Sequence, residues 1–425
     1  VVMFFDFVWG FKLRKVGKFL KEKWAWLLFP IFVSLSILWT GNLVRGILTV
    51  GILWLIYFAG FAIFTRKKLL NAEFWRKFLK WFFGAGLFAC AWCLVQCILD
   101  IAGVSREVSL MCVGCTTQMF GFPHPNGFAI EPQFMGNLLL APAIVSAVLV
   151  LKKKSVGIPL FLIFVAGLFL TFSRGAIYAF IVAMIFLIAF EIMRTKKMRA
   201  LVLVLISCLA FLFTLNLQGI FAQVSKTNDT YLTGVTKVLN HLSLGIIDIP
   251  IDKNESEEIA EGPVVETEDN DAVFDGYVEE STNIRVGLTE SAMRVWSRNF
   301  STMMFGVGIG GAGEAMFKAG EIGSPKEIVQ NEYVSLLLEV GLVGVLLCAL
   351  TVFYILRTVW RNEKSEMVFA LIFAYAISLL FFSGLPNALQ IYLLPVVFYL
   401  STTSPSTASS SEDLSPSLAA SSEAD

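Results

Sequence analysis

A series of long apolar segments constrains this chain more than any other feature of its sequence. A helix needs about 20 apolar residues to cross a bilayer, and ten runs reach or approach this length. They cover residues 24–39, 44–64, 81–99, 137–151, 157–172, 175–192, 200–217, 333–356, 367–383 and 387–400. Runs such as 200–217 lack the alternation of apolar and polar residues that barrel strands show. The sequence therefore predicts an all-α, polytopic membrane protein with about ten or more transmembrane helices.

The composition excludes several other classes of protein. Hydrophobic residues make up 56% of the 425 residues and charged residues only 16%, with a mean hydropathy of +0.73. A soluble domain carries about 25% charged residues, so a soluble enzyme is excluded. Seven cysteines are too few for a disulfide scaffold. Equal numbers of acidic and basic residues, 33 of each, give no sign of nucleic acid as a partner.

The distribution of Lys and Arg predicts the orientation of the helices, because basic residues accumulate in cytoplasmic loops. One set of short loops holds 22 basic residues, within segments 12–23, 66–80, 152–154, 194–199 and 357–364. The opposite short loops hold only Arg45, Arg106 and Arg174. We therefore expect both termini in the cytoplasm. The first apolar run follows a basic segment but shows no small-residue cleavage site, so we expect it to remain as a span.

Polar segments divide the chain further. The predicted regions are N-terminal transmembrane helices in 1–217, a large extracytoplasmic loop domain in 218–332, C-terminal transmembrane helices in 333–400 and a disordered cytoplasmic tail in 401–425. Residues 100–136 form a second external loop. The segment 248–280 carries 13 acidic residues and only one Lys, a composition typical of a solvated insertion.

Three polar motifs interrupt the apolar pattern, and the first is Thr171-Phe-Ser-Arg-Gly-Ala-Ile-Tyr178. It places Arg174 in a very short turn between two apolar runs, on the side that the other cations avoid. An arginine that reaches toward lipid headgroups is the ordinary explanation. A cation beside the hydrocarbon is costly without an anionic partner, and guanidinium binds phosphate oxygens in a planar fork. The motif therefore points to a lipid phosphate or pyrophosphate.

The second motif joins Ser291-Ala-Met-Arg-Val-Trp-Ser-Arg298 to the glycine-rich stretch Phe305-Gly-Val-Gly-Ile-Gly-Gly-Ala-Gly313. Arg294 and Arg298 are four residues apart and would share a helix face, with Trp296 on another face. An amphipathic helix with exposed cations is the ordinary alternative. The glycines resemble a dinucleotide fingerprint, but no strand pattern precedes them. A tight turn that depends on glycine is the better interpretation.

The third motif is Val329-Gln-Asn-Glu-Tyr-Val-Ser-Leu-Leu-Leu-Glu-Val-Gly-Leu-Val-Gly344. It places Gln330, Asn331 and Glu332 where the large external loop ends and a span begins. A polar helix cap is the ordinary explanation, and it suits Asn331 well.

Taken together, these segments resemble the O-antigen ligase and polymerase family of envelope glycosyltransferases. The resemblance covers roughly residues 133–386. It is carried by "SRG" after an apolar run, by an Arg-x-Trp stretch leading into "GVGIG", and by "QNEYVSLLLEVGLVG". Each motif is short, but their order and their common membrane side make the set more specific.

The resemblance implies a GT-C-like helical fold in the bacterial inner (plasma) membrane. Members transfer a glycan from an undecaprenyl-pyrophosphate carrier to a glycan or lipid acceptor outside the cytoplasm, without a cofactor or a metal. Arg174 and Arg294 match the two arginines that hold the pyrophosphate. The neighbouring residues that the resemblance assigns to substrate binding are Arg298, Trp296, Asn331 and Glu332.

The chain departs from the ligase pattern at Gln330, where ligases typically carry histidine. Glutamine cannot accept a proton as a catalytic base, so the resemblance favours a polymerase over a ligase. The segment "HPNGFAIEPQFMGN" also resembles a stretch of polysaccharide polymerases, which makes Glu131 a candidate base or acceptor ligand. The alternative is a loop glutamate before a helix that begins at Pro132.

Two other functions remain open from the sequence. A transporter or flippase of lipid-linked oligosaccharide would show paired repeats and interrupted helices, and neither is evident in the sequence. A sensor would need an output domain, which is not recognisable. Among lesser features, Cys112 and Cys115 could form a disulfide outside the cytoplasm. His124 and His241 do not match the position of the family's base.

Overall fold

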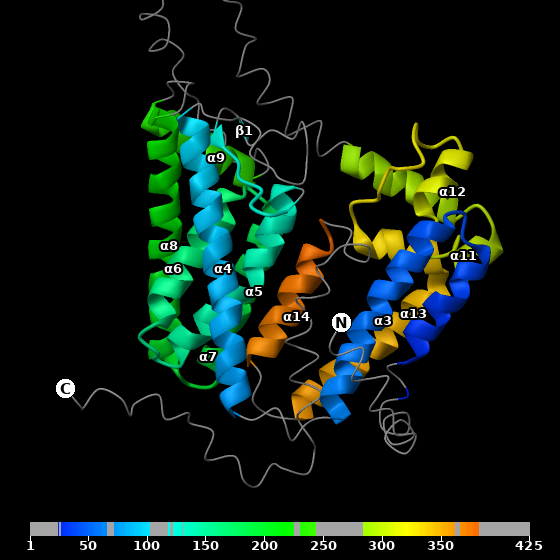
Figure 1. Cartoon of the computed structure of the whole chain (residues 1–425), viewed down its shortest axis with the longest axis horizontal. Coiled ribbons are helices and arrows are strands. Elements are labelled where there is room, and N and C mark those ends of the chain that lie inside the picture. The colour runs from blue at the N-terminus through cyan, green and yellow to red at the C-terminus, as the bar shows by residue number, and fades with distance from the viewer. Residues whose placement is uncertain are drawn as a thin grey trace, which may run out of the picture. The chain divides into compact units, whose positions relative to one another are not determined.

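The computed structural model of the chain is almost entirely helical (Figure 1). It describes residues 24, 27–65, 72–102, 118–119, 122–129, 131–224, 230–243, 284–361 and 366–381. The chain divides into two compact units. The central unit comprises residues 85–289 and 373–381, and the flanking unit comprises residues 1–84, 290–372 and 382–425.

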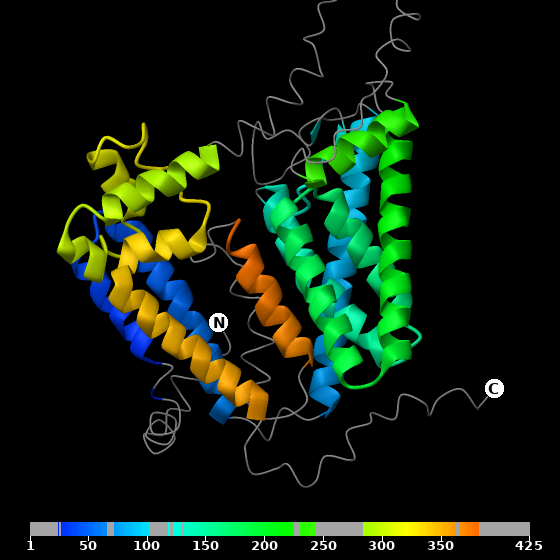
Figure 2. The same cartoon turned by 180° about the vertical axis from the view of Figure 1, so that it is seen from behind.

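The central unit is a bundle of antiparallel helices (Figures 1 and 2). Its helices are α4 (Ala72–Ile101, from residue 85 onward), α5 (Pro132–Leu151), α6 (Gly157–Leu170), α7 (Arg174–Met193), α8 (Lys197–Val224) and α9 (Tyr231–Ser243). A short antiparallel pair, β1 (Gln118–Met119) and β2 (Phe122–Pro123), lies between α4 and α5 in the sequence. Because α5 to α8 alternate in direction, the N-termini of α5 and α7 lie at the same end of the bundle as the C-termini of α6 and α8.

Helix α5 forms the centre of this bundle, where it packs against α6, α7 and α8. Fifteen of its 20 residues are buried. A helix that is apolar around its whole circumference is suited to such a position, because no face needs water. Its polar residue Asn137 is buried and accepts a hydrogen bond from the Ser378 hydroxyl.

The turns at the other end of the central unit are the basic ones. Lys152, Lys153 and Lys154 follow α5, and the segment 194–199 follows α7. Both turns use a residue with positive φ, Lys153 at 55° and Thr195 at 60°. Two of the five basic segments of the sequence, 152–154 and 194–199, therefore lie at the end of this unit opposite Arg174.

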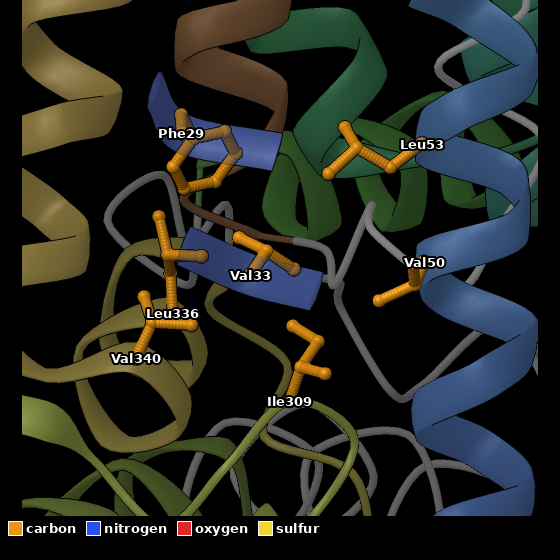
Figure 3. Packing of buried hydrophobic residues seen from close by; sticks show 7 residues of the cluster. All are labelled: Phe29, Val33, Val50, Leu53, Ile309, Leu336 and Val340. Atoms are coloured by element: carbon orange, nitrogen blue, oxygen red, sulfur yellow. The ribbon is translucent and has the colours of Figure 1, made fainter. Parts of the chain in front are cut away.

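The flanking unit contains a helix over residues 27–35 that continues into the 3₁₀ turn η1 (Ser36–Trp39). Its other elements are α3 (Leu43–Thr65), a helix over residues 284–296 whose second half belongs to this unit, α11 (Phe300–Phe305), α12 (Ala312–Lys318) and α13 (Glu332–Arg361). Figure 3 shows its apolar cluster, made of Phe29, Val33, Val50, Leu53, Ile309, Leu336 and Val340. Helix α14 (Glu366–Ser378) has residues in both units.

The glycine-rich stretch is a loop packed backbone to backbone. Gly306, Gly308 and Gly310 have φ values of 73°, 89° and 75°, a region that side-chain-bearing residues rarely adopt. A Cβ atom on Gly308 would lie 2.6 Å from the Thr40 nitrogen, and one on Gly306 would lie 2.3 Å from the Glu339 carbonyl oxygen. The glycines therefore serve conformation and close packing, as the interpretation of a tight turn predicts.

Helix α13 is broken at Gly341, where φ is 63° and ψ is −173°. The predicted span over 333–356 agrees with the apolar segment Glu332–Tyr354, but the helix has a kink at this glycine. The break leaves carbonyl groups without helical partners, and the glycine-rich loop supplies them. The Val307 N–H donates to the Leu338 carbonyl and the Gly308 N–H to the Glu339 carbonyl, each at 2.9 Å. A sequence reading of the apolar pattern misses this, because a single glycine is compatible with a continuous helix.

The all-helical prediction is confirmed for the described residues, but the count of about ten or more spans is not confirmed. Five described helices are long and apolar enough to cross a membrane, over Lys77–Ile101, Pro132–Leu151, Arg174–Met193, Lys197–Phe221 and Glu332–Tyr354. Four shorter apolar helices cover Leu27–Trp39, Leu43–Tyr57, Gly157–Leu170 and Glu366–Ser378. The predicted span 387–400, the acidic insertion 248–280, the tail 401–425 and the pair Cys112 and Cys115 lie outside the described residues. The predicted division of the chain into regions stays a prediction.

We expect Gly308→Ala to destabilise the protein by about 1–3 kcal/mol, because its Cβ overlaps the Thr40 backbone. Gly323→Ala is the matched control, since nothing lies within 4 Å of a Cβ at that glycine. Thermal unfolding of both variants in detergent measures the difference. Equal midpoint temperatures for the two variants would contradict the packing described for the loop.

Candidate functional site

The turn between α6 and α7 presents Arg174. Helix α6 ends at Leu170, and α7 begins at Arg174 with Ser173 as its N-cap residue. The Thr171 hydroxyl donates to the Leu168 carbonyl at 2.7 Å and accepts the Ser173 N–H at 3.4 Å. Phe172 makes the reversal with a positive φ of 46°. For a residue with a side chain, this left-handed conformation costs about 1–2 kcal/mol.

Two histidines satisfy the carbonyl groups of this turn. His124 donates its Nε2–H to the Thr171 carbonyl at 2.7 Å, and His241 donates its Nε2–H to the Phe172 carbonyl at 3.2 Å. Both imidazoles also meet the Phe172 ring edge to face, with centroids 5.8 Å and 6.0 Å away. These carbonyls follow the C-terminus of α6, where helical partners run out. The two histidines thus complete the helix end and enclose the phenylalanine.

Arg174 itself is buried, with 9% of its surface exposed. Burial argues against the ordinary explanation of an arginine extended toward headgroups at the protein surface. As the first residue of α7, it places a cation at the positive end of a helix dipole, which is an unfavourable position. The guanidinium and the helix terminus together create a positive potential that an anion would stabilise.

Burial lowers the pKa of both histidines. It lowers that of His124 to about 4, and the hydrogen bond to the Thr171 carbonyl opposes this shift in part. The pKa of His241 falls to about 3, first through burial and then through the charges of Arg174, His124 and Arg285, against the bond to Phe172. Both imidazoles are therefore neutral at pH 7 and add no charge beside Arg174.

Glu131 lies at the N-cap of α5, at the same end of the central unit as Arg174. Its side chain is exposed and accepts a hydrogen bond from Gln133. One turn further along α5, a Cβ on Gly136 would lie 2.7 Å from the Ser173 side chain, so α5 begins directly against the α6–α7 turn. Pro132 is the first helical residue, as the alternative interpretation predicts. The carboxylate of Glu131 is thus exposed at the N-terminus of this helix.

In the flanking unit, Arg294 and Arg298 share a face, as their spacing predicts. Both bind the carboxylate of Glu321, Arg294 through Nε at 2.8 Å and Arg298 through Nη2 at 2.9 Å. Arg298 also donates to the Ala319 carbonyl at 3.1 Å. The hydrogen bond from Arg294 is the largest of the effects that hold the pKa of Glu321 below its usual range. Glu321 therefore already partly neutralises the two cations, and the Glu290 carboxylate lies 3.7 Å from Arg294 as well.

The remaining predicted residues of the flanking unit differ in their roles. Trp296 is half-buried against the core, and its indole N–H donates to the Met303 carbonyl at 3.2 Å. Asn331 caps α13 by accepting the N–H groups of Tyr333 and Val334 at 3.1 Å and 3.2 Å. The polar-cap interpretation is thus confirmed for Asn331, and Trp296 has a structural contact of its own.

Gln330 and Glu332 flank this cap. The Gln330 amide oxygen is buried and accepts no hydrogen bond from the described residues. Glu332 is buried, with 6% exposure, and begins α13, where a carboxylate is favoured by the helix dipole. Among the described residues, no group of three His, Cys, Asp or Glu side chains is placed to hold a metal ion.

Sequence reasoning missed His124 and His241 as partners of the turn before Arg174, and Glu321 as the partner of Arg294 and Arg298. The histidines lie 47 and 69 positions from the carbonyls that they bind. Glu321 lies 27 positions from Arg294. No local spacing rule connects residues at such separations. The available signal was the scarcity of histidine itself, since the chain has only two.

The lowered pKa values make stability depend on pH. The unfolded chain binds protons to these histidines below a pKa of about 6.5, whereas the folded protein does so only near 4 and 3. Unfolding is therefore favoured as the pH falls from about 7 to about 5, a window above the range of ordinary carboxylates. We expect the melting midpoint in detergent to fall across this window, and to fall less in His241→Gln. An equal fall in both proteins would contradict the buried, neutral state of His241.

Residues 159–349 of the chain match the family model described as O-Antigen ligase. No curated protein and no solved structure is detectably similar to the chain. The matched segment contains Arg174, Arg294 and Gln330, and it excludes Glu131. The apolar helices and this match agree with the resemblance that the three motifs carry. The chain is therefore similar to the O-antigen ligase family over residues 159–349, and its apolar helices are those of an integral membrane protein.

Proposed function

We propose that the protein transfers a glycan from an undecaprenyl-pyrophosphate carrier to a glycan or lipid acceptor on the extracytoplasmic face of the bacterial inner membrane. Polymerisation is favoured over ligation, because Gln330 stands where ligases typically have histidine. Both termini then lie in the cytoplasm, in keeping with the basic segments of the sequence.

The observation that carries this proposal is the buried Arg174 at the N-terminus of an apolar helix. A guanidinium binds the oxygens of a phosphate in a planar fork, and the N-terminus of a helix is itself a site that favours anions. A diphosphate on a lipid carrier supplies such an anion beside apolar helices, and Arg can bind it through two parallel N–H groups.

The proposed chemistry uses charge stabilisation. Attack of an acceptor hydroxyl on the sugar C1 breaks the bond to the pyrophosphate, and negative charge develops on the departing phosphate. A prearranged guanidinium stabilises that charge without a metal. The acceptor attacks from the face opposite the leaving group, so the anomeric configuration inverts. The resemblance supplies the donor, and Arg174 supplies the cationic group.

The flanking unit contributes a second cationic group in this proposal. Arg294 and Arg298 form one face of positive charge around Glu321, whose side chain is 16% exposed. An incoming phosphate would have to compete with this carboxylate. Trp296 and Asn331 then act by fixing the backbone around the arginines and the start of α13, rather than by touching sugar.

The general base is proposed among the carboxylates. Glu131 is exposed at the N-terminus of α5, at the end of the central unit that carries Arg174. Glu332 is buried at the N-terminus of α13. Because a helix N-terminus favours the ionised carboxylate, and a base must reach the acceptor hydroxyl, we favour the exposed Glu131. Gln330 can orient a hydroxyl but cannot take its proton.

A transporter or flippase of lipid-linked oligosaccharide is the second candidate, and the break in α13 favours it. Interrupted helices in transporters expose carbonyl groups that coordinate ions or substrates. In this chain, the carbonyls of Leu338 and Glu339 already accept N–H groups from Val307 and Gly308. The carbonyl groups at the break therefore anchor the glycine-rich loop. Because they are already paired, they give little support to a role in binding transported substrate.

Reconstitution of the purified protein with a lipid-linked oligosaccharide tests the proposal. Growth of the glycan chain identifies a polymerase, and transfer to a lipid acceptor identifies a ligase. Movement of the intact donor between leaflets without a new glycosidic bond would overturn the proposal in favour of the transporter.

We expect Arg174→Ala to lower glycan transfer by at least about 10²-fold, the scale for the loss of one charge-stabilising donor. Arg174→Lys should retain part of the activity, since the charge remains but the bidentate geometry is lost. Arg294→Ala is expected to lower transfer as well. Lys326→Ala, an exposed cation of the flanking unit, is the control that should leave transfer unchanged. Normal product from both arginine variants would reject the assignment.

Glu131→Gln keeps the size of the side chain and removes its basicity. If Glu131 is the base, the substitution should lower kcat by about 10²–10⁴-fold. The KM for the lipid-linked donor should change little. Glu332→Gln serves as the comparison. A large loss in the Glu332 variant and none in the Glu131 variant would move the base to the flanking unit.

A further inference from the structure

The two histidines of the chain bind consecutive carbonyl groups of the turn that leads into Arg174. They come from different segments. His124 lies beyond β2, and His241 lies in the last turn of α9. Neither was assigned a role by the resemblance. Their convergence is specific, because Thr171, Phe172 and Ser173 are the only residues between the helical parts of α6 and α7.

The segment that carries His124 is itself anchored. The Gln96 amide of α4 donates to the Asn126 side chain at 3.0 Å and accepts the Gly127 N–H at 2.8 Å. Gln96 and Asn126 are both buried, with 0% and 3% exposure. The imidazole of His124 therefore reaches the turn from a fixed support on α4 rather than from a free loop.

Helix α9 binds the chain on both sides of Arg174. Before it, the Phe172 carbonyl accepts from His241; after it, the Tyr178 hydroxyl donates to the Leu242 carbonyl at 2.5 Å. Two adjacent residues of α9 thus hold the start of α7 at two points, six positions apart in sequence. The first turn of α7, with Arg174 in it, lies between these two attachments.

The turn needs such support because its conformation is unfavourable on its own. Phe172 adopts a positive φ, and the carbonyls at the end of α6 would be costly without donors in apolar surroundings. A displacement of about 1 Å in a charge-stabilising group can cost about 10²-fold in rate. The donors that set the turn therefore also set the position of the guanidinium.

We propose that His124 and His241 are positioning residues, which act through Arg174 by holding the α6–α7 turn. This inference rests on the proposed role of Arg174 in glycan transfer. The two imidazoles donate hydrogen bonds in their neutral form and take no part in proton transfer. Helix α9, which follows α8 at the start of the large predicted external loop, becomes part of the support of the site.

The test uses His241→Leu, which removes the donor, and His241→Gln, whose amide N–H can replace it. In the reconstituted full-length protein, we expect His241→Leu to lower kcat by about 10–100-fold, and His241→Gln to restore most of it. Tyr231→Phe is the matched control on α9. It removes the bond from Tyr231 to Asn216 at the other end of that helix and should leave kcat unchanged.

A double-mutant cycle separates positioning from a general loss of structure. If His241 acts through Arg174, then His241→Leu should cause little further loss in the Arg174→Lys background, so the two effects are not additive. Melting midpoints verify that each variant is folded. A folded His241→Leu protein with normal kcat, or fully additive losses, would overturn the positioning role.

Binding of undecaprenyl pyrophosphate in detergent distinguishes the failure of this inference from that of the proposed function. If wild type and Arg174→Ala bind the lipid equally and transfer glycan equally, the role of Arg174 is wrong. If Arg174→Ala loses binding and transfer while folded His241→Leu and His124→Leu keep both, only the positioning role is wrong.

Discussion

A guanidinium group buried at the N-terminus of a membrane helix is the constraint around which the central unit is organised. Arg174 combines a side-chain charge with the positive end of the α7 dipole, in a unit whose core helix α5 is apolar on every side. A guanidinium and a helix N-terminus at one place both favour the binding of an anion. The neutral histidines beside it add hydrogen-bond donors without adding charge.

The flanking unit is held together in part by close contacts between backbone segments. Glycines with positive φ let the loop at 306–310 reach η1, the start of α3 and the break in α13. Each of these contacts would be blocked by a single Cβ atom. The break at Gly341 exposes carbonyls, and the loop donates N–H groups to them, so the two irregular segments satisfy each other. The same unit carries Arg294 and Arg298, which both bind Glu321.

The sequence predicted the short turn that leads into Arg174, the shared face of Arg294 and Arg298, and the cap at Asn331, because each follows from local spacing. Periodicity and motif order describe residues within a few turns of one another. The sequence did not predict the break in α13, since one glycine in an apolar run also fits a straight helix. It did not predict His124, His241 or Glu321 as partners either. Those contacts join segments 27 to 69 positions apart, and only packing brings them together.

The sequence by itself determined the helical class, the membrane setting, the separation of basic and acidic segments and the short motifs that resemble O-antigen ligases. These features depend on composition and on periodicity along the chain, which need no knowledge of long-range contacts. The tertiary structure decided which side chains support the arginines, which carbonyls the glycine-rich loop satisfies, and that Arg174 is buried. Burial and hydrogen-bond pairing depend on which residues are neighbours in space. Residues far apart in the sequence become neighbours only when the chain folds.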